Sequence, residues 1–201
     1  MQVNDGRRSA FIREHLLGSA EVKRSLAERC AREIEEAANL MTDSLRHGGK
    51  ILLCGNGGSA ADCQHIAAEF TSILSKGFMR PAMAAIALTT DTSFLTANAN
   101  DFGFEGVFAR QIEALGRPGD VLVGISTSGE SLNVIRAISC ASELSLRTIA
   151  FTGSTGGQLA RMADVAIKVP SDNTSHIQES HIAIGHVICA VVEQGMFGDE
   201  R

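Results

Sequence analysis

Short apolar runs that end in glycine-rich or hydroxyl-rich turns recur along this chain, and this pattern restricts the fold more than any other feature of the sequence. Five such runs predict β-strands, over Lys50–Cys54, Met83–Leu88, Asp120–Ile125, Leu146–Phe151 and Asp164–Val169. Helical periodicity follows the first of them, over Ala60–Ser75. Strands that alternate with helices form a parallel sheet covered on both faces. The sequence therefore predicts an α/β fold with three layers, αβα, around a five-stranded parallel sheet.

Two longer helices are expected outside these units. Between Ala20 and His47, apolar residues recur every three or four positions, which is the pattern of a long amphipathic helix. A second helix is expected over Ser175–Phe197, where Ser175 and Gln178 have the spacing of a capping box. The buried positions expected in this last helix are Ile177, Ile184, Val187, Ile188, Val191 and Val192.

Composition excludes several classes of function. The 201 residues, 44% of them hydrophobic, fit one globular domain. A formal charge of −5, the lack of a basic block and the absence of Trp and Tyr argue against nucleic-acid binding. The five cysteines show no C-x-x-C spacing, which disfavours a disulfide framework and favours a reducing cytoplasm. No signal peptide is expected, because the N-terminal stretch MQVNDGRRSAFIREHL has no apolar region. No membrane span is expected, because the most hydrophobic stretch, Ile182–Val192, is interrupted by Gly185 and His186.

Two of the expected strand ends carry loops that have the character of anion cradles. After the first strand, Gly57 and Gly58 let the backbone approach an oxyanion, and the helix that begins near Ser59 directs free N–H groups toward it. After the third strand, the hydroxyls of Ser126–Ser131 suit a phosphate monoester. Neither loop contains a lysine, which argues against hydrolysis of a nucleoside triphosphate. The alternative is that both loops are only tight turns, and the presence of two such loops weakens it.

Two pairs of polar side chains on the predicted helices could carry chemistry. His65 and Glu69 are one turn apart and share a face, so they could share a metal ion or a proton. A solvated polar face is the alternative, and Asp62 on the same stripe is consistent with it. Gln178 and His186 lie about 12 Å apart along a helix axis and about 80° apart around it, so they serve one centre only by reaching toward each other. The alternative role for His186 is that of a buried structural histidine.

Five segments of the chain together resemble one known family. They are Gly55–Glu69 (GNGGSAADCQHIAAE), 88–93 (LTTDTS), Ala99–Asp101, 124–131 (GISTSGES) and Ile177–His181 with His186. This combination is similar to the phosphoheptose isomerases, which are sugar-isomerase (SIS) domain enzymes, and the match covers nearly the whole chain. The resemblance implies a single SIS-type domain over residues 1–201 that interconverts sedoheptulose 7-phosphate and D-glycero-D-manno-heptose 7-phosphate.

The resemblance also implies roles for individual residues. Substrate contacts are expected from Asn56, Gly57, Gly58, Ser59, Glu69, Asn100, Asp101, Ser126, Thr127, Ser128, Ser131 and Gln178. One zinc ion (Zn²⁺) per subunit is expected at His65, Glu69, Gln178 and His186. Glu69 is the expected base and His186 the expected acid of a reaction through an enediol.

A homotetramer is expected, with residues 1–48 as its helical oligomerisation segment. The apolar stripe of this segment is longer than the sheet of one subunit needs, and an apolar surface of that kind is buried between subunits. The resemblance agrees, since it implies sites that lie between subunits.

Two departures from the family pattern bear on the substrate rather than on the fold. Glu130 stands where the family usually has Asn, and Ala99 where it usually has Gly. A carboxylate beside a phosphate cradle is unfavourable unless its side chain turns outward. Two other functions are considered: a non-catalytic SIS protein that binds a bacterial replication initiator, and a sensor of sugar phosphates. The presence of Glu69 and His186 favours the enzyme.

Overall fold

Five strands follow one another in the positions that the sequence predicts, each within two residues of its predicted bounds. The structure is a computed structural model that describes residues 3–198. Its strands are β1 (Ile51–Gly55), β2 (Ala85–Ala87), β3 (Val121–Ile125), β4 (Arg147–Thr152) and β5 (Val165–Lys168). Its α-helices are α1 (Val3–Arg29), α2 (Ala31–Arg46), α3 (Gly58–Thr71), α4 (Thr92–Phe102), α5 (Val107–Leu115), α6 (Leu132–Glu143), α7 (Gly157–Met162) and α8 (Thr174–Phe197).

The order of the strands, β2-β1-β3-β4-β5, brings the loops after β1 and β3 together. All neighbouring strands pair in parallel, and Ile51 lies between Ala85 on one side and Val121 on the other. From β1 the chain moves outward to β2 and then returns to the other side of β1 as β3. Parallel sheets bind ligands at such a reversal, outside the carboxyl ends of the strands. The glycine loop after β1 and the serine loop after β3 both lie there.

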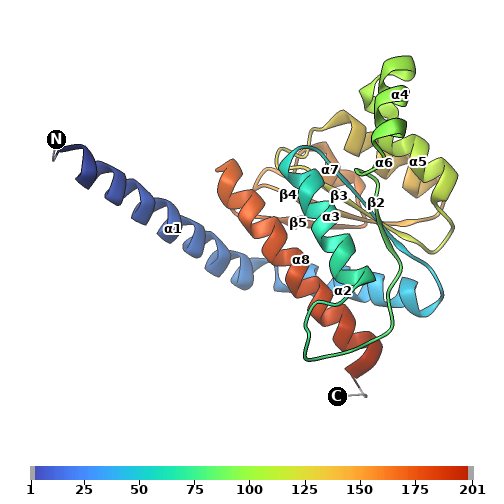
Figure 1. The fold of residues 1–201 in the computed structure, drawn as a ribbon, viewed down its shortest axis with the longest axis horizontal. Helices are drawn as coiled ribbons and strands as arrows, with labels where there is room; N and C mark the ends of the chain where they lie inside the picture. Colours follow the sequence, from blue (N-terminus) through green and yellow to red (C-terminus); the bar gives the residue numbers. More distant parts are fainter. Residues whose placement is uncertain (1–2, 199–201) are drawn as a thin grey trace.

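Alternate side chains along each strand divide the core into two layers. Ile51 and Leu53 of β1 pack with residues of α2, α3 and α8, whereas Leu52 and Cys54 pack with residues of α5, α6 and α7. All four of these side chains are fully buried. Figure 1 shows α3 and α8 side by side over one face of the sheet. The predicted three-layer α/β fold is therefore confirmed.

The N-terminal helical region differs from its prediction in two ways. The helix begins at Val3 rather than near Ala20, and it is interrupted at Cys30. The first turns of α1 contact little of the subunit. Their sequence therefore does not alternate between a buried and a polar face, and the helix could not be recognised there. The interruption is also hidden, because the bonds from the Cys30 amide to Leu26 O and from the Ile34 amide to Cys30 O preserve helical spacing across it. The change of direction lets α2 follow the sheet while α1 extends away from it (Figure 1).

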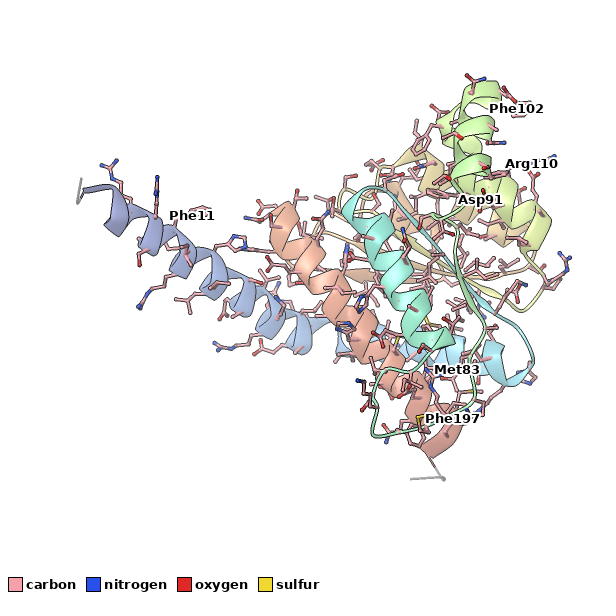
Figure 2. The ribbon with its side chains drawn as sticks, in the orientation of Figure 1. Phe11, Met83, Asp91, Phe102, Arg110 and Phe197 are labelled. Carbon is pink, nitrogen blue, oxygen red and sulfur yellow. The ribbon has the colours of Figure 1, made fainter. Side chains whose placement is uncertain are left out.

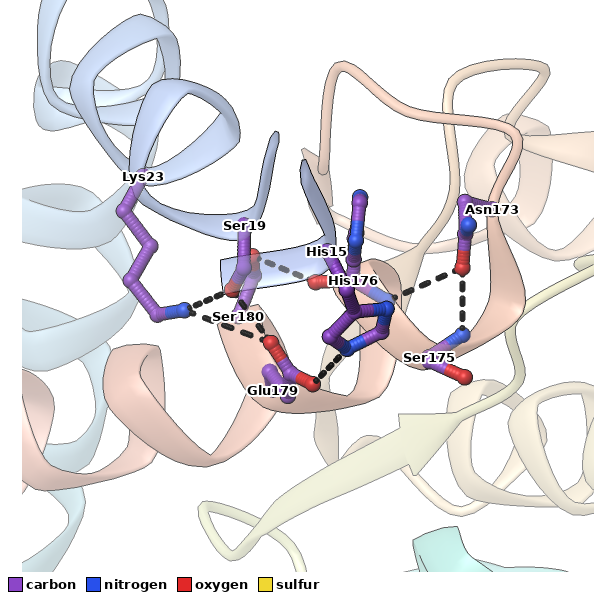
Figure 3. A network of polar contacts seen from close by, with 8 residues as sticks. All are labelled: His15, Ser19, Lys23, Asn173, Ser175, His176, Glu179 and Ser180. Carbon is purple, nitrogen blue, oxygen red and sulfur yellow. Dashed lines mark hydrogen bonds and ion pairs between the residues drawn. The ribbon is translucent and has the colours of Figure 1, made fainter. Parts of the chain in front are cut away.

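A polar network attaches α1 to the first turns of α8 (Figure 3). The Glu179 carboxylate accepts hydrogen bonds from Ser19 and His15, and the Lys23 ammonium lies 3.7 Å from it. Gly18 packs closely on the same helix, because a Cβ there would lie 2.9 Å from the His176 ring. This network fixes the middle of α1, while Phe11 and Leu16 on α1 stay exposed.

The last helix is confirmed, but two details predicted for it are wrong. Its N-cap is Asn173, whose side-chain oxygen accepts from the Ser175 and His176 amides, so Ser175 is not the cap of a capping box. Val187 is 49% exposed rather than buried. By length and composition α8 could cross a membrane, but 44% of its most apolar window is buried inside the fold. It packs against α2 and α3 as a core helix does.

Candidate active site at the carboxyl edge of the sheet

Three polar side chains converge from two helices, α3, which follows the loop after β1, and α8. The His65 Nε2 atom lies 2.9 Å from His186 Nε2 and 3.3 Å from Glu69 Oε1. One ligand atom from each of the three residues lies within 4.8 Å of the others. His186 is exposed, so the alternative of a buried structural histidine is wrong. We refer to His65, Glu69 and His186 as the triad.

The triad depends on the packing of α3 against α8. His65 and Glu69 share one face of α3 because they are four residues apart, and His186 comes from α8. The two helices approach closely next to it, since a Cβ on Gly185 would lie 2.6 Å from Ile66 Cδ1. A glycine at this position therefore allows the histidine rings to meet, with ring centroids 5.1 Å apart.

The donor atoms of the triad suit a divalent metal ion. Two imidazole nitrogens and a carboxylate oxygen are ligands that zinc accepts, with a further position left for water or substrate. Two Nε2 atoms at 2.9 Å need a proton or a cation between them, because neutral acceptor nitrogens repel each other. The residues present therefore fit a metal ion on chemical grounds. Nearby, burial raises the pKa of Asp62, and the charge of His65 opposes this effect.

Gln178 lies on α8 about two turns before His186, and it contacts the first turn of α3. A Cβ on Gly58 would lie 2.9 Å from its side-chain nitrogen, so the amide rests directly on the glycine loop. Gly57, just before the helix, has a φ of +55°, a conformation that glycine adopts readily. Gln178 thus contacts the glycine loop, and its role as a metal ligand stays a prediction.

The serine loop after β3 forms a hydroxyl cluster. Ser126 Oγ is buried, lies 2.9 Å from Ser131 Oγ and 3.4 Å from Ser128 Oγ, and accepts from the Gly129 amide. Ser131 is the N-cap of α6 but makes no side-chain cap bond, so its hydroxyl is directed toward the cluster. Thr127 and Ser128 also line a cavity of about 220 Å³ that continues toward α8. Clustered hydroxyls at a helix N-terminus are well suited to a phosphate.

An amide pair joins the two loops. Asn56 donates to the Asn133 side-chain oxygen at 2.9 Å, and Asn133 donates back to the Asn56 oxygen at 2.8 Å. The side chain of Asn56, predicted to contact substrate, is therefore occupied by a partner 77 residues away. Sequence analysis missed Asn133. The one signal was a buried-face asparagine in the first turn of a helix, where asparagine is a poor helix former.

The Glu130 side chain turns away from the hydroxyl cluster, as the sequence analysis required of a carboxylate beside a phosphate cradle. Its carboxylate accepts from the Gln158 amide in the first turn of α7, at 2.9 Å. The carboxylate therefore accepts from a free backbone N–H at the N-terminus of α7, where a negative charge is favourable.

Comparison with known proteins identifies the family of the chain. The SIS domain family matches residues 17–153. A phosphoheptose isomerase of Akkermansia muciniphila is 51% identical over 94% of this chain and 99% of its own length. One of Aquifex aeolicus is 53% identical over 88% of this chain and 91% of its own. The structure of phosphoheptose isomerase GmhA from Neisseria gonorrhoeae has a TM-score of 0.87 at 46% identity, covering 92% of this chain and 98% of that one.

The chain belongs to the phosphoheptose isomerase family. It is accordingly an isomerase with an SIS fold. The structure of a phosphoheptose isomerase from Francisella tularensis gives the same fold, with a TM-score of 0.86 at 38% identity over 96% of this chain and all of that one.

Two residues that the phosphoheptose isomerase pattern predicts as substrate contacts lie on a different helix from the triad. Asn100 and Asp101 are exposed in the last turns of α4, and the Asn100 amide donates to the Asp101 carboxylate at 2.9 Å. None of the α4 residues is buried, and Phe102 beside them is 79% exposed. The subunit thus presents this pair to solvent, and its contact with substrate stays a prediction.

Proposed function

We propose that this protein interconverts sedoheptulose 7-phosphate and D-glycero-D-manno-heptose 7-phosphate at the triad. The observation that carries the proposal is the convergence of His65, Glu69 and His186 on two helices of a subunit that also forms a hydroxyl cluster in the loop after β3. The names of the similar curated proteins support the substrate class.

The reaction moves one hydrogen between neighbouring carbons, and the triad holds the groups that this requires. Glu69 takes a proton from C1 of the ketose while His186 gives one to the carbonyl oxygen at C2, which forms an enediol. The hydroxyl at C1 then gives its proton to His186 and Glu69 returns one to C2, which forms the aldose and restores both side chains to their starting states. A positioned carboxylate and imidazole contribute typically 10²- to 10⁴-fold each to such transfers.

Zinc is proposed to bind at the triad, with Gln178 as the further ligand. His65 and His186 supply nitrogen, and Glu69 and Gln178 supply oxygen. When bound, a zinc ion polarises the substrate carbonyl. The hydroxyl cluster formed by Ser126, Ser128 and Ser131 holds the phosphate and so places the reacting carbons at Glu69.

Turnover in heavy water tests this assignment. With sedoheptulose 7-phosphate as substrate, we expect the aldose to carry deuterium at C2, because a proton on Glu69 exchanges with solvent before it returns. Glu69→Gln keeps the shape of the side chain but not its basicity, so turnover should fall at least about 10²-fold with substrate still bound. Asp62→Asn makes the same chemical change on the same helix and should keep activity.

Two results contradict the proposal. Wild-type turnover in Glu69→Gln eliminates Glu69 as the base. Aldose without deuterium at C2 leaves either a shielded proton on Glu69 or a hydride shift, and the turnover of Glu69→Gln decides between them. Protein that binds sedoheptulose 7-phosphate without forming aldose supports the sensor in place of the enzyme.

A homotetramer is proposed as the working form. Four large apolar side chains of α1 are exposed, Phe11, Ile12, Leu16 and Leu17. Figure 2 shows Phe11 on the part of α1 that extends away from the sheet. An apolar cleft of about 500 Å³ lies between α1, α2 and α8, with Val187 at its lining. Burial of these surfaces against other copies would remove them from water. Light scattering that gives a monomer at micromolar concentration contradicts the proposal.

A cytoplasmic location is proposed as well. All five cysteines are free, and four of them are buried. Burial raises the pKa of the Cys189 thiol to about 12, which keeps it protonated and unreactive. Free buried thiols are typical of a reducing compartment. Fractionation of the source cells with an antibody against the chain tests this.

A further inference from the structure

A buried ion pair joins the two helices that carry the triad, on the side away from the glycine loop. Arg80 Nε donates to Glu193 Oε1 of α8 at 2.6 Å, and the side chains are 0% and 2% exposed. Two charges in such a place are costly to bury unless their remaining hydrogen-bonding groups are satisfied. The other hydrogen-bond partners of Arg80 therefore show what this ion pair holds in place.

The rest of the Arg80 guanidinium binds the end of α3. Its Nη2 donates to the carbonyl of Glu69 at 2.7 Å, and its Nη1 donates to the carbonyl of Phe70 at 2.9 Å. These carbonyls lie in the last turn of the helix, where no further helical N–H reaches them. A positive charge there is also favourable to the helix dipole. The guanidinium thus touches the peptide unit of Glu69 itself.

Glu193 lies on nearly the same face of α8 as His186. It follows His186 by seven residues, which is about 10 Å along the axis and within about 20° of the same face. Contacts between α3 and α8 follow the same order along both helices. Gly58 contacts Gln178, and Ile66 contacts Gly185 further along. Arg80 then links the carbonyls of Glu69 and Phe70 to Glu193. The helices therefore run parallel, and the close contact at Gly185 and the Arg80 bridge are two points that fix one helix against the other.

We propose that Arg80 and Glu193 are positioning residues, which hold the Glu69 end of α3 against α8 so that Glu69 and His186 meet at one centre. This inference rests on the proposed function for the identity of the reaction, but not for its geometry. A shift of α8 along α3 by part of a turn would separate His186 from His65 while leaving both helices folded. A bridge that binds the backbone of Glu69 opposes such a shift.

Zinc affinity, measured by competition with a chromogenic chelator, tests the proposal together with kcat and KM. Glu193→Gln keeps the shape of the side chain but removes the charge that faces Arg80. We expect zinc affinity to fall about 10- to 100-fold, as for residues that orient a metal ligand. We expect kcat to fall and KM to change little, because the serine loop belongs to other elements.

Arg80→Lys is a second variant in case Glu193→Gln folds poorly. A lysine keeps the charge, but its ammonium does not reproduce the planar fork that binds three carbonyls, of Glu69, Phe70 and Pro81, and the Glu193 carboxylate. The same losses are expected. The matched control is Asp120→Asn. Asp120 is 2% exposed and accepts from the Lys50 side chain and from the Arg117 amide, far along the chain from α3 and α8. This control should lower Tm and leave zinc affinity unchanged.

NMR of the metal-free protein with labelled histidine gives a readout that does not depend on turnover. It measures the contacts between the ring protons of His65 and His186. They should weaken in Glu193→Gln and persist in Asp120→Asn. Wild-type zinc affinity and ring contacts in both Glu193→Gln and Arg80→Lys, with only Tm lowered, overturn the proposal. If the wild type does not isomerise sedoheptulose 7-phosphate but the variants lose the ring contacts, the proposed function fails and the positioning role stands.

Discussion

Acidification should destabilise this protein through one histidine outside the triad. His181 on α8 is 0% exposed, its Nε2 lies 3.2 Å from the carbonyl of Thr152, and its Nδ1 has no hydrogen-bond partner. Burial lowers the pKa of His181 from 6.5 to about 4, although the bond to Thr152 acts in the opposite direction. The ring is therefore neutral in the folded protein at pH values where it is charged in the unfolded chain.

The direction and size of the effect follow from this difference in pKa. A group whose pKa is lowered by folding contributes stability that is complete above its unfolded value and is lost as the pH falls toward the folded value. For His181 this window runs from pH 6.5 to about 4. At 1.36 kcal/mol per pKa unit, the whole window corresponds to about 3 kcal/mol, and the part between pH 7.5 and 5 to about 2 kcal/mol.

Urea unfolding of wild type and His181→Gln, with chelator and at one fixed protein concentration, measures this contribution. The Gln side chain keeps an N–H group that can donate to Thr152. Between pH 7.5 and 5, the wild type should lose about 2 kcal/mol more of its free energy of unfolding than the variant. His47→Gln serves as the control, because that histidine is exposed and meets water in both states. Equal losses in wild type and His181→Gln refute the argument.

Three further changes have defined outcomes. Gly129→Ala should cost at least about 2 kcal/mol in urea unfolding, because φ is +69° there and a Cβ would lie 2.1 Å from the carbonyl oxygen of Gly156; wild-type stability would contradict the packing of the serine loop. Ser126→Ala should raise KM for sedoheptulose 7-phosphate roughly tenfold or more with kcat little changed, since a hydrogen bond to a charged group contributes roughly 1.5 to 3 kcal/mol; an unchanged KM would place the phosphate elsewhere. Hydrogen bonds from Ser19 and then His15 lower the pKa of Glu179 below 4.5, so the attachment of α1 is complete above that value and is lost as pH falls below it. Glu179→Gln removes the charge at every pH, so limited proteolysis at pH 7 should cut α1 faster in the variant than in the wild type; equal rates would show that this network does not hold α1.

The parts of the fold that were predictable are those that local sequence encodes. The five strands and their turns are apolar runs next to glycine and serine, and their parallel pairing follows from the helices between them. The helix break at Cys30 was not predictable, because helical spacing continues through it. The cap at Asn173 was missed because Ser175 offers an equally good capping pattern two residues later.

The site was predictable to the extent that it follows the helical repeat. The pairing of His65 with Glu69 is a spacing of four residues, and their meeting with His186 came from the family resemblance. Asn133, which holds Asn56, and Glu193, which holds Arg80, bond across 77 and 113 residues. No local pattern reports such a contact, because it exists only after the sheet has brought the loops and helices together.

The last helix that the structure describes, α8, supplies His186, one of the three members of the triad. It packs on the same side of the sheet as α2 and α3. A chain cut before Thr174 lacks α8, so the apolar residues of α2 and α3 that pack against this helix stay uncovered. Such a product also lacks His186 and cannot form the triad, and its uncovered apolar surface favours aggregation.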